Sequence, residues 1–585
     1  MIDLNEEQQA MLNGRYGVAK QMGMRLLLDM AAAAGATELI PITSAHLSGV
    51  SPLTGGLGLR QFLARLTQDP QAQVAVPTTL NSAGCDAAQF DAMRITTPQF
   101  KEHSLEIVAY YEQLGVQPTQ SCTPYEWEGV ASSGTAAWAE SNAIAFGNSY
   151  CGLVTNRESG LSALACALTG YTPKYGLLHE EQRRPNLQVL VTAVLDDPTD
   201  FSILGDWIGK QRQAGWKMPL GPIPHIKGLP ADLNHEQKKA LTAAAANYGC
   251  PLLYIEGVGD IPDGTYQDVL RFGPQELAQR YAELAPKTAV SLITIGCPQA
   301  SMGELRATAQ LLQGHTLAAA APPLWVFTSA QNKAIAEKTG IAAAIRAAGA
   351  LLLENTCPEV VPYDPTWVHH VLTNSMKAEH YIKSGLNGIP TSVMKLADCV
   401  AVALGEKEGW REERGGKRVA ATGKSHVSSS PTAVSSRPLA SGSFAAAGHG
   451  LPSQADFTIT GVAFVTDTPV TFLGFVNRET GVIEEEGHPA NGESMAGKIA
   501  IFPKGSGSTV APYVLLELHY RGMAPIAIVN TTIDQQSAPA CSLEGIPYAY
   551  QFDDDIIANI NQGDMVELKR SDAHVTIRVI ARKEG

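Results

Sequence analysis

Two kinds of pattern alternate along the first two thirds of the chain. Short apolar runs bounded by turn residues, such as 187–195 and 287–296, are typical of buried strands. Between them, segments such as 5–34 and 302–314 carry apolar residues at helical spacing, which predicts amphipathic helices. Strands that alternate with helices form parallel sheets whose faces are covered by helices. The pattern therefore predicts an α/β fold with several sheet layers.

The pattern changes near residue 408. Residues 408–452 are rich in Gly, Ser, Ala and basic residues and show no apolar periodicity, which is typical of a flexible linker. Beyond them, residues 453–585 contain several strand-like runs and a helical stretch at 511–522. We expect a large α/β domain over 1–407, a linker over 408–452 and a small β-rich domain over 453–585.

Composition and charge narrow the range of partners. The 585 residues are enough for about four folding units of roughly 150 residues each. The 43 Lys and Arg against 57 Asp and Glu give a formal net charge of −14, which disfavours nucleic acid as a partner because phosphate binding needs a basic face. The acidic N-terminus does not resemble a signal peptide, and the apolar runs are too short for a membrane span. We therefore expect a cytoplasmic protein with no membrane partner.

Three of the nine cysteines have a similar setting. Cys297 and Cys357 are each followed by Pro, and Cys122 is followed by Thr-Pro. Because Pro keeps the preceding residue out of the helical region, these cysteines are expected in rigid turns at strand ends, where the ligand sites of α/β sheets collect. They could converge on one iron–sulfur cluster. The alternative is three ordinary buried thiols, since Cys is among the most buried residue types.

Several polar segments are candidates for a pocket wall. The segment 137–170 is dense in Asn, Ser, Glu and Arg; Asn156 and Arg157 fit a pocket or a helix cap and surface ion equally well, and for Glu140 we expect a structural role. The turn Lys504–Thr509, with the sequence KGSGST, offers N–H groups and hydroxyls to an anion, although a plain turn is the commoner explanation. Four more polar residues follow apolar segments, where caps and turns are also common: His46, Asn81, Ser375 and Lys377. Motifs of zincins, serine hydrolases and dinucleotide-binding folds are absent from the sequence.

Taken together, these segments resemble the motifs of the aconitase X family in their order along the chain. The large part carries SAHLSG, VPTTLN, SCTPYE, AWAESNAIAFGNS, TNRESG, IGCPQAS and TNSMKAEHY, and the small part carries TGVIEEEGHPANGESMAGKI, FPKGSGST and GMAPIAIV. The likeness covers nearly the whole chain apart from the linker. It implies an aconitase-like fold, in which α/β layers form one wall of a cleft and a swivelling β-rich domain forms the other. Some relatives carry the two parts as separate chains, so this fused chain is expected to need no separate small subunit.

The resemblance also implies roles for individual residues. An iron–sulfur cluster would be held by Cys122, Cys297 and Cys357, and Ser508 would supply the catalytic base, with Lys377 as the next candidate. The residues expected to bind the substrate are His46, Ser48, Asn81, Asn156, Arg157, Ser375, Lys504, Gly507 and Thr509.

The family is associated with two dehydrations of small hydroxy acids. Members with fused parts resemble dehydratases of cis-3-hydroxy-L-proline, and two-chain members resemble dehydratases of mevalonate 5-phosphate, so the fused arrangement favours the first. The implied product is Δ1-pyrroline-2-carboxylate, formed through an enamine, with the cluster iron acting as a Lewis acid. Two departures bear on the substrate. Gln299 and Ala300 stand where relatives often have His and Cys, and Asn477 stands where relatives often have Asp.

Two other functions stay open at this point. Aconitase relatives can bind RNA when the cluster is lost, so one alternative is a cluster-dependent RNA-binding regulator, against which the net charge of −14 argues. The other is a hydro-lyase that uses a bound divalent metal in place of a cluster.

Overall fold

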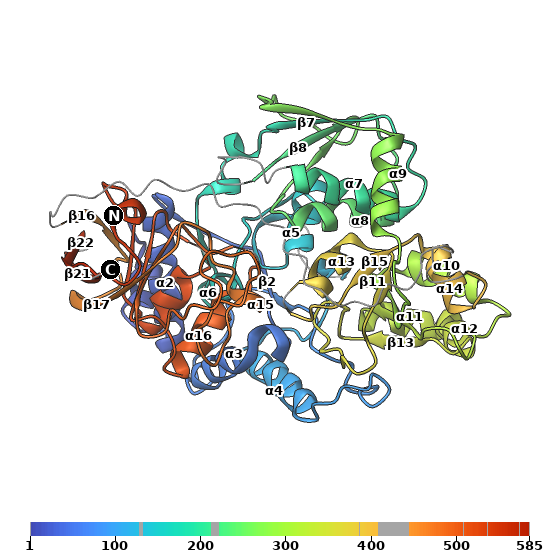
Figure 1. Ribbon diagram of the computed structural model, residues 1–585, viewed down its shortest axis with the longest axis horizontal. Coiled ribbons are helices and arrows are strands. Elements are labelled where there is room, and N and C mark those ends of the chain that lie inside the picture. The colour runs from blue at the N-terminus through green and yellow to red at the C-terminus, as the bar shows by residue number, and fades with distance from the viewer. Residues whose placement is uncertain are drawn as a thin grey trace.

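The computed structural model describes residues 2–127, 133–211, 221–384, 386–407, 444–506, 508–534, 536–572 and 574–583. Successive units along the chain are each built around a main sheet of their own (Figure 1). The main sheet is parallel in the first three units, and the last unit is a closed barrel. The predicted α/β layers with a β-rich C-terminal domain are confirmed.

The first unit begins with paired helices. Its elements are α1 (Glu6–Leu12), α2 (Val18–Ala34), β1 (Leu39–Pro41), β2 (Ser44–Leu47), α3 (Pro52–Leu66), β3 (Thr78–Leu80), α4 (Gln99–Gln113), η1 (Pro124–Glu126), β4 (Gly134–Trp138), α5 (Ser141–Tyr150), β5 (Leu153–Val154), α6 (Gly160–Thr169), β6 (Tyr171–Pro173), η2 (Gly176–Leu178) and η3 (Glu180–Arg183). The parallel sheet has the order β3-β2-β4-β5, and β1 and β6 form a short antiparallel pair. Because β2 is buried along its whole length, its carboxyl end brings Ser48 into the interior.

The second and third units are parallel sheets flanked by helices. The second contains β7 (Leu187–Val191), α7 (Pro198–Gln211), β8 (Pro224–Lys227), α8 (His235–Ala246), β9 (Tyr254–Ile255), β10 (Asp268–Phe272) and α9 (Pro274–Leu284). The third contains β11 (Leu292–Ala300), α10 (Met302–Leu312), β12 (Leu324–Thr328), α11 (Ala330–Thr339), α12 (Ile341–Ala347), β13 (Leu351–Glu354), β14 (Val371–Thr373), α13 (Met376–Lys383), β15 (Thr391–Val393) and α14 (Leu396–Ala403). The sheet orders are β10-β7-β8-β9 and β13-β12-β11-β14-β15. Strand β11 lies at the centre and is buried along its whole length, in agreement with the apolar run at its start.

The fourth unit is a barrel with helices packed outside it. It contains β16 (Ala445–Gly450), β17 (Phe457–Val465), α15 (Phe472–Phe475), β18 (Ile499–Phe502), α16 (Pro512–Tyr520), β19 (Ala527–Asn530), α17 (Ala538–Glu544), β20 (Tyr548–Tyr550), α18 (Ile556–Asn559), β21 (Met565–Ser571) and β22 (His574–Ala581). The strand order is β16-β20-β19-β18-β17-β21-β22. The polar turn KGSGST lies between β18 and α16, as the sequence predicts.

The linker predicted up to residue 452 ends earlier. Residues 408–443 lie outside the described part of the chain, but Ala445–Gly450 form β16, which pairs with β20 and β22. The inward positions of this strand are occupied by small residues, including Gly448. A Cβ atom on Gly448 would lie 2.9 Å from the Phe552 ring. The inward positions of the strand therefore require small residues, and its hydropathy resembles that of a linker.

An arginine clasp joins the small domain to the first unit, at the place where Figure 1 shows α16 beside α3. Arg478 donates hydrogen bonds to the backbone carbonyls of Leu53 and Thr54, each at 3.0 Å. The same guanidinium pairs with Glu517 of α16 at 3.0 Å. Glu517 in turn accepts a hydrogen bond from the Leu57 N–H at 3.2 Å. These contacts fix the beginning of α3 against the small domain.

Gly56→Ala is expected to disrupt this clasp. Gly56 has a φ of +58°, and a Cβ there would lie 2.1 Å from Nη1 of Arg478 and 2.2 Å from Oε2 of Glu517. We expect a loss of at least about 3 kcal/mol in the free energy of unfolding, because backbone strain adds to the forced separation of the ion pair. Gly35→Ala is the matched control, since Gly35 has a φ of +67° with no atom within 4 Å, and it should cost only about 1–2 kcal/mol. Denaturant unfolding measures both, and equal losses would argue against the clasp.

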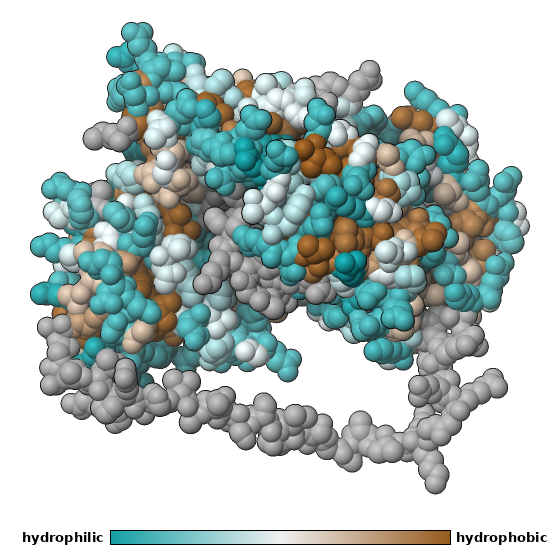
Figure 2. Space-filling view, turned by 90° about the horizontal axis from the view of Figure 1, so that it is seen from above, coloured by the Kyte–Doolittle hydropathy of each residue, from teal (hydrophilic) through white to brown (hydrophobic). Residues whose placement is uncertain are grey.

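The surface mixes polar and apolar residues. Figure 2 shows apolar residues on one face in small groups between hydrophilic ones. Within the described residues, no helix has both the length and the apolar character needed to span a membrane.

Candidate active site

Cys122, Cys297 and Cys357 line a single cavity. Cys122 follows a segment that runs beside β3, Cys297 lies near the end of β11, and Cys357 follows β13. All three are buried, with 4%, 7% and 4% of their surface exposed. The structure thus brings together the three cysteines that the sequence singled out, from two different units of the large part.

Burial dominates the chemistry of these thiols. It raises the pKa of Cys122 to about 12, and it raises the pKa values of Cys297 and Cys357 well above the ordinary value. The Cys297 thiol donates to Glu359 Oε1 at 2.9 Å, and Cys122 Sγ accepts the backbone N–H of Gln299 at 3.3 Å. Thiols in this environment ionise only when a positive charge compensates, as a bound metal does.

A buried lysine lies between two carboxylates in the same cavity. Lys377 Nζ is 3.3 Å from Glu140 Oε1 and 3.0 Å from Glu359 Oε1. The ammonium also lies 4.5 Å from the centre of the Tyr381 ring. Lys377, Glu140, Glu359 and Tyr381 all line the cavity beside the cysteines. This part of the cavity wall therefore carries one ammonium group and two carboxyl groups.

The charges in this group differ in proton affinity. Burial alone would lower the pKa of Lys377, but attraction by Glu140 and Glu359 holds it well above its ordinary value. Burial favours protonation of Glu140, yet Lys377, Asn142 and His46 together keep its pKa below the usual range. Burial raises the pKa of Glu359, and Lys377 offsets this only in part. Lys377 is therefore a cation at neutral pH, with Glu140 as its main anionic partner.

The small domain supplies another part of the lining. Ser508, Thr509 and Val510 reach the cavity from the turn between β18 and α16. Thr509 Oγ1 donates to the Ala139 carbonyl at 2.9 Å, and the Gly160 N–H donates to the Thr509 carbonyl at 3.1 Å. The turn is thus held against the first unit by two hydrogen bonds, one donated by each of the two domains.

The two serines of this turn have different surroundings. Ser508 Oγ accepts the Val510 N–H at 3.4 Å and lies at the cavity. The hydroxyl of Ser506 is paired with that of Thr471 at 2.6 Å, away from the cavity lining. Gly507, between them, lies outside the described residues. The available hydroxyl is therefore that of Ser508.

Several buried polar atoms around the cavity have no partner among the described residues. They include the hydroxyls of Ser48 and Ser82 and Oδ1 of Asn81, whose Nδ2 donates to Glu140 at 2.8 Å. Arg157 Nε is also buried without a partner, and Arg157 lies close enough to Tyr381 to offset part of the rise that burial causes in the pKa of that phenol. An unpaired buried polar group costs about 1–3 kcal/mol. Such a concentration indicates a ligand site.

Five predicted site residues in the described part of the chain lie outside the lining of this cavity, and one of them is Arg157, whose unpartnered Nε is noted above. His46 is fully buried, its Nδ1 is bonded to Thr79 at 2.8 Å, and burial lowers its pKa to about 4. Asn156 is bonded through both side-chain ends to backbone groups of Tyr175 and Leu177. Ser375 caps the N-terminus of α13, which is the helix-cap role that the sequence offered as the alternative to substrate binding. The Lys504 side chain is exposed.

Sequence reasoning missed part of the lining. Glu140 was expected to be structural, whereas it pairs with Lys377 inside the cavity, and Glu359, Ser82 and Tyr381 were not considered. Glu359 follows Cys357 by two positions, which is the one signal that could have found it. Glu140, Ser82 and Tyr381 can be recognised as lining residues only after distant segments are brought together by the fold.

Three parts of the chain match known domain families. The Aconitase X first domain matches residues 1–181, the Aconitase X third domain matches 290–405, and the Aconitase X swivel domain matches 453–577. These ranges correspond to the first, third and fourth units of the structure.

Named relatives and a solved structure agree with these matches. The phosphomevalonate dehydratase large subunit of Methanosarcina mazei is 34% identical over 416 residues, which is 69% of this chain and 98% of that protein. The cis-3-hydroxy-L-proline dehydratase of Pseudomonas aeruginosa is 33% identical over 421 residues, or 69% of this chain and 70% of that protein. The crystal structure of holo-form Thermococcus kodakaraensis aconitase X matches with a TM-score of 0.62 and 31% identity, covering 69% of this chain and 100% of that one.

The chain belongs to the aconitase X family. The resemblance seen in the sequence motifs is confirmed. Because its named aconitase X relatives are dehydratases, the protein is an enzyme of the hydro-lyase class.

A cut between residues 408 and 443 should leave this aconitase X protein active. At least one relative carries its large part as a separate subunit, and the Arg478 clasp joins the two parts here without help from this segment. We expect the two pieces to co-purify and to keep at least about half of the parental activity. A cut at residue 452 is the control, because it separates β16 from the rest of the barrel chain and should destabilise the small piece more than the first cut does. Loss of activity in the first pair while it stays associated would contradict this expectation.

Proposed function

We propose that this aconitase X protein removes water from cis-3-hydroxy-L-proline and forms Δ1-pyrroline-2-carboxylate through an enamine. The carrying observation is one cavity lined by three cysteines of the large part and by Ser508 of the small domain. In this substrate the hydroxyl and the C2 hydrogen lie on opposite faces of the ring, so elimination is anti. The proton acceptor and the group that receives the hydroxyl must then lie on opposite sides. Walls contributed by different domains suit this requirement.

The charges of the lining favour this substrate over mevalonate 5-phosphate. The charged lining residues in the described chain are Glu140, Glu359 and Lys377, and Lys377 is already paired with both carboxylates. An amino acid offers its ammonium to carboxylates and its single carboxylate to one cation, such as Arg157, whose Nε is buried with no partner among the described residues. Mevalonate 5-phosphate carries a phosphate as well as a carboxylate and would need further cations.

We further propose that Cys122, Cys297 and Cys357 hold an iron–sulfur cluster. The donor set fits such a group, because three buried thiols from separate loops line one cavity. Among the residues described, no group of three or more His, Cys, Asp or Glu side chains has the arrangement needed to hold one metal ion. When bound, such a cluster supplies a Lewis-acidic iron.

The side chains of the chain divide the remaining work. Ser508 takes the C2 proton, and because a serine is a weak base at its free pKa, it needs activation by nearby donors such as the Val510 N–H. Lys504, whose side chain is exposed, is the other candidate for this activation. Lys377, held as a cation, stabilises the negative charge that develops on the substrate carboxylate when the proton leaves.

A substrate panel tests this proposal. Iron-loaded protein is assayed with cis-3-hydroxy-L-proline, its trans isomer and mevalonate 5-phosphate, with water loss followed by NMR. We expect kcat/KM for the cis isomer to exceed that for either alternative by at least about 100-fold. Preferential conversion of mevalonate 5-phosphate would overturn the substrate assignment while leaving the reaction class intact.

A further inference from the structure

Gln299 contacts the loops of all three cysteines. It follows Cys297 by two positions, and its Nε2 donates hydrogen bonds to the backbone carbonyls of Gln120 at 3.2 Å and Thr356 at 3.0 Å. Its backbone N–H donates to Cys122 Sγ at 3.3 Å. The residue is fully buried. A single side chain and its own peptide group therefore connect three loops that are far apart in the sequence.

Two of these loops have strained backbones. Gln120 has a φ of +44° and Asn355 a φ of +64°, and each lies two residues before a cysteine of the cavity. A left-handed conformation costs a residue other than glycine about 1–2 kcal/mol. Such turns persist where the surroundings fix them. The hydrogen bonds from Gln299 to Gln120 and to Thr356, which follows Asn355, provide this restraint.

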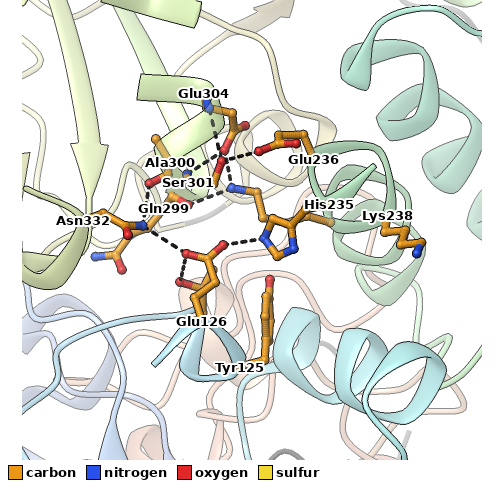
Figure 3. A network of polar contacts seen from close by, with 12 residues as sticks. Tyr125, Glu126, His235, Glu236, Lys238, Gln299, Ala300, Ser301, Glu304 and Asn332 are labelled. Carbon is orange, nitrogen blue, oxygen red and sulfur yellow. Dashed lines mark hydrogen bonds and ion pairs between the residues drawn. The ribbon is translucent and has the colours of Figure 1, made fainter. Parts of the chain in front are cut away.

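The second unit also contacts Gln299, through its backbone carbonyl. The buried Lys239 of α8 donates to the Gln299 carbonyl at 2.8 Å and forms an ion pair with Glu304. Figure 3 shows Gln299 and Glu304 close together, with Glu126 of η1 and Asn332 beside them. Asn332 donates to Glu126 at 3.1 Å. The network gives the Gln299 peptide a fixed position between the second and third units.

We propose that Gln299 is a positioning residue that holds the three cysteine loops at the spacing a cluster needs. The inference rests on the proposed cluster but not on the identity of the substrate. Gln299 is not part of the cavity lining, so it acts through the cysteines. Its loss should affect the retention of iron more than the affinity for substrate.

The test uses Gln299→Met and Gln299→Glu in the full-length, iron-loaded protein. Methionine keeps the volume without the donors, and glutamate places a carboxylate against two carbonyl oxygens. We expect both variants to lose iron to a chelator about 10- to 100-fold faster than the parent, the range typical of changes around metal ligands. Iron content and visible absorbance follow the loss, and KM should change less than kcat.

Gln454→Met is the matched control. Gln454 also donates two hydrogen bonds from Nε2 to backbone carbonyls, those of Cys541 at 3.3 Å and Ile546 at 2.6 Å, but it lies in the small domain. Its variant should release iron at the parental rate. Adding Gln120→Gly to Gln299→Met should slow iron loss again, because glycine removes the strain at position 120.

The outcomes separate the two proposals. If Gln299→Met folds and releases iron at the parental rate, the positioning role is wrong. If that variant does not fold, iron release is measured in the double variant with Gln120→Gly, and release at the parental rate again shows that the positioning role is wrong. If the parent itself binds no iron–sulfur cluster, the proposed cofactor fails instead.

Discussion

Replacing any one of Cys122, Cys297 or Cys357 with alanine is expected to bleach the protein and abolish its dehydratase activity. Each thiol is a buried wall of the same cavity, and no other described cysteine lines it. Activity should fall by more than about 100-fold, which exceeds the usual effect of changes one shell away from a metal ligand. Iron and sulfide analysis together with kcat measures the loss.

Three other buried cysteines serve as controls for these changes. Cys166 and Cys541 lie in the apolar core shared by the first unit and the small domain, and Cys85 lies in the apolar cluster that also contains Cys297 but does not line the cavity. Their alanine variants should keep iron and activity, because a small cavity costs stability but no ligand. Full iron content in any of the three ligand variants would show that the ligand set is misassigned.

Ser508→Ala should lower kcat by at least about 100-fold, because general-base catalysis contributes about 10²–10⁴-fold. Ser508 belongs to the cavity lining from the small domain, whereas the proposed cluster ligands belong to the large part. Iron content and the visible spectrum should therefore stay at the parental level. Steady-state kinetics and absorbance on the same preparation check both expectations.

Ser506→Ala is the internal control in the same turn. The Ser506 hydroxyl is paired with Thr471 at 2.6 Å and does not line the cavity, so its variant should be milder. A more damaging effect of Ser506→Ala would mean that the base is misassigned. Lys377, the next candidate in the sequence, is held as a cation by its two carboxylates and would need to lose its proton first.

Most of the fold could be predicted because its signals are local. The alternation of apolar strands with helices predicts parallel sheets, and the apolar run at the start of strand β11 predicts a buried strand. Strand β16 was not readable, because close packing against Phe552 requires glycine and leaves no hydropathy alternation. Hydropathy periodicity detects a strand by its large buried apolar side chains, and β16 has none at its inward positions.

The site was predictable only where residues share a local setting. The Pro-flanked turns of Cys122, Cys297 and Cys357 are visible in the sequence, and all three meet in one cavity. The pairing of Lys377 with Glu140 joins segments that nothing local connects. The same holds for Gln299, because its three hydrogen bonds join loops that are far apart in the sequence and so could not be predicted from it.

Conversion of cis-3-hydroxy-L-proline carrying deuterium at C2 tests the central claim most directly. Iron-loaded parent protein and Ser508→Ala are incubated with this substrate, and NMR follows both the C2 deuterium and the product. Proton abstraction from C2 with loss of the C3 hydroxyl predicts that deuterium passes to solvent as Δ1-pyrroline-2-carboxylate appears, and that the variant does neither at a comparable rate. Loss of water with deuterium retained in the product, or no product from protein that holds its cluster, would contradict the proposed reaction.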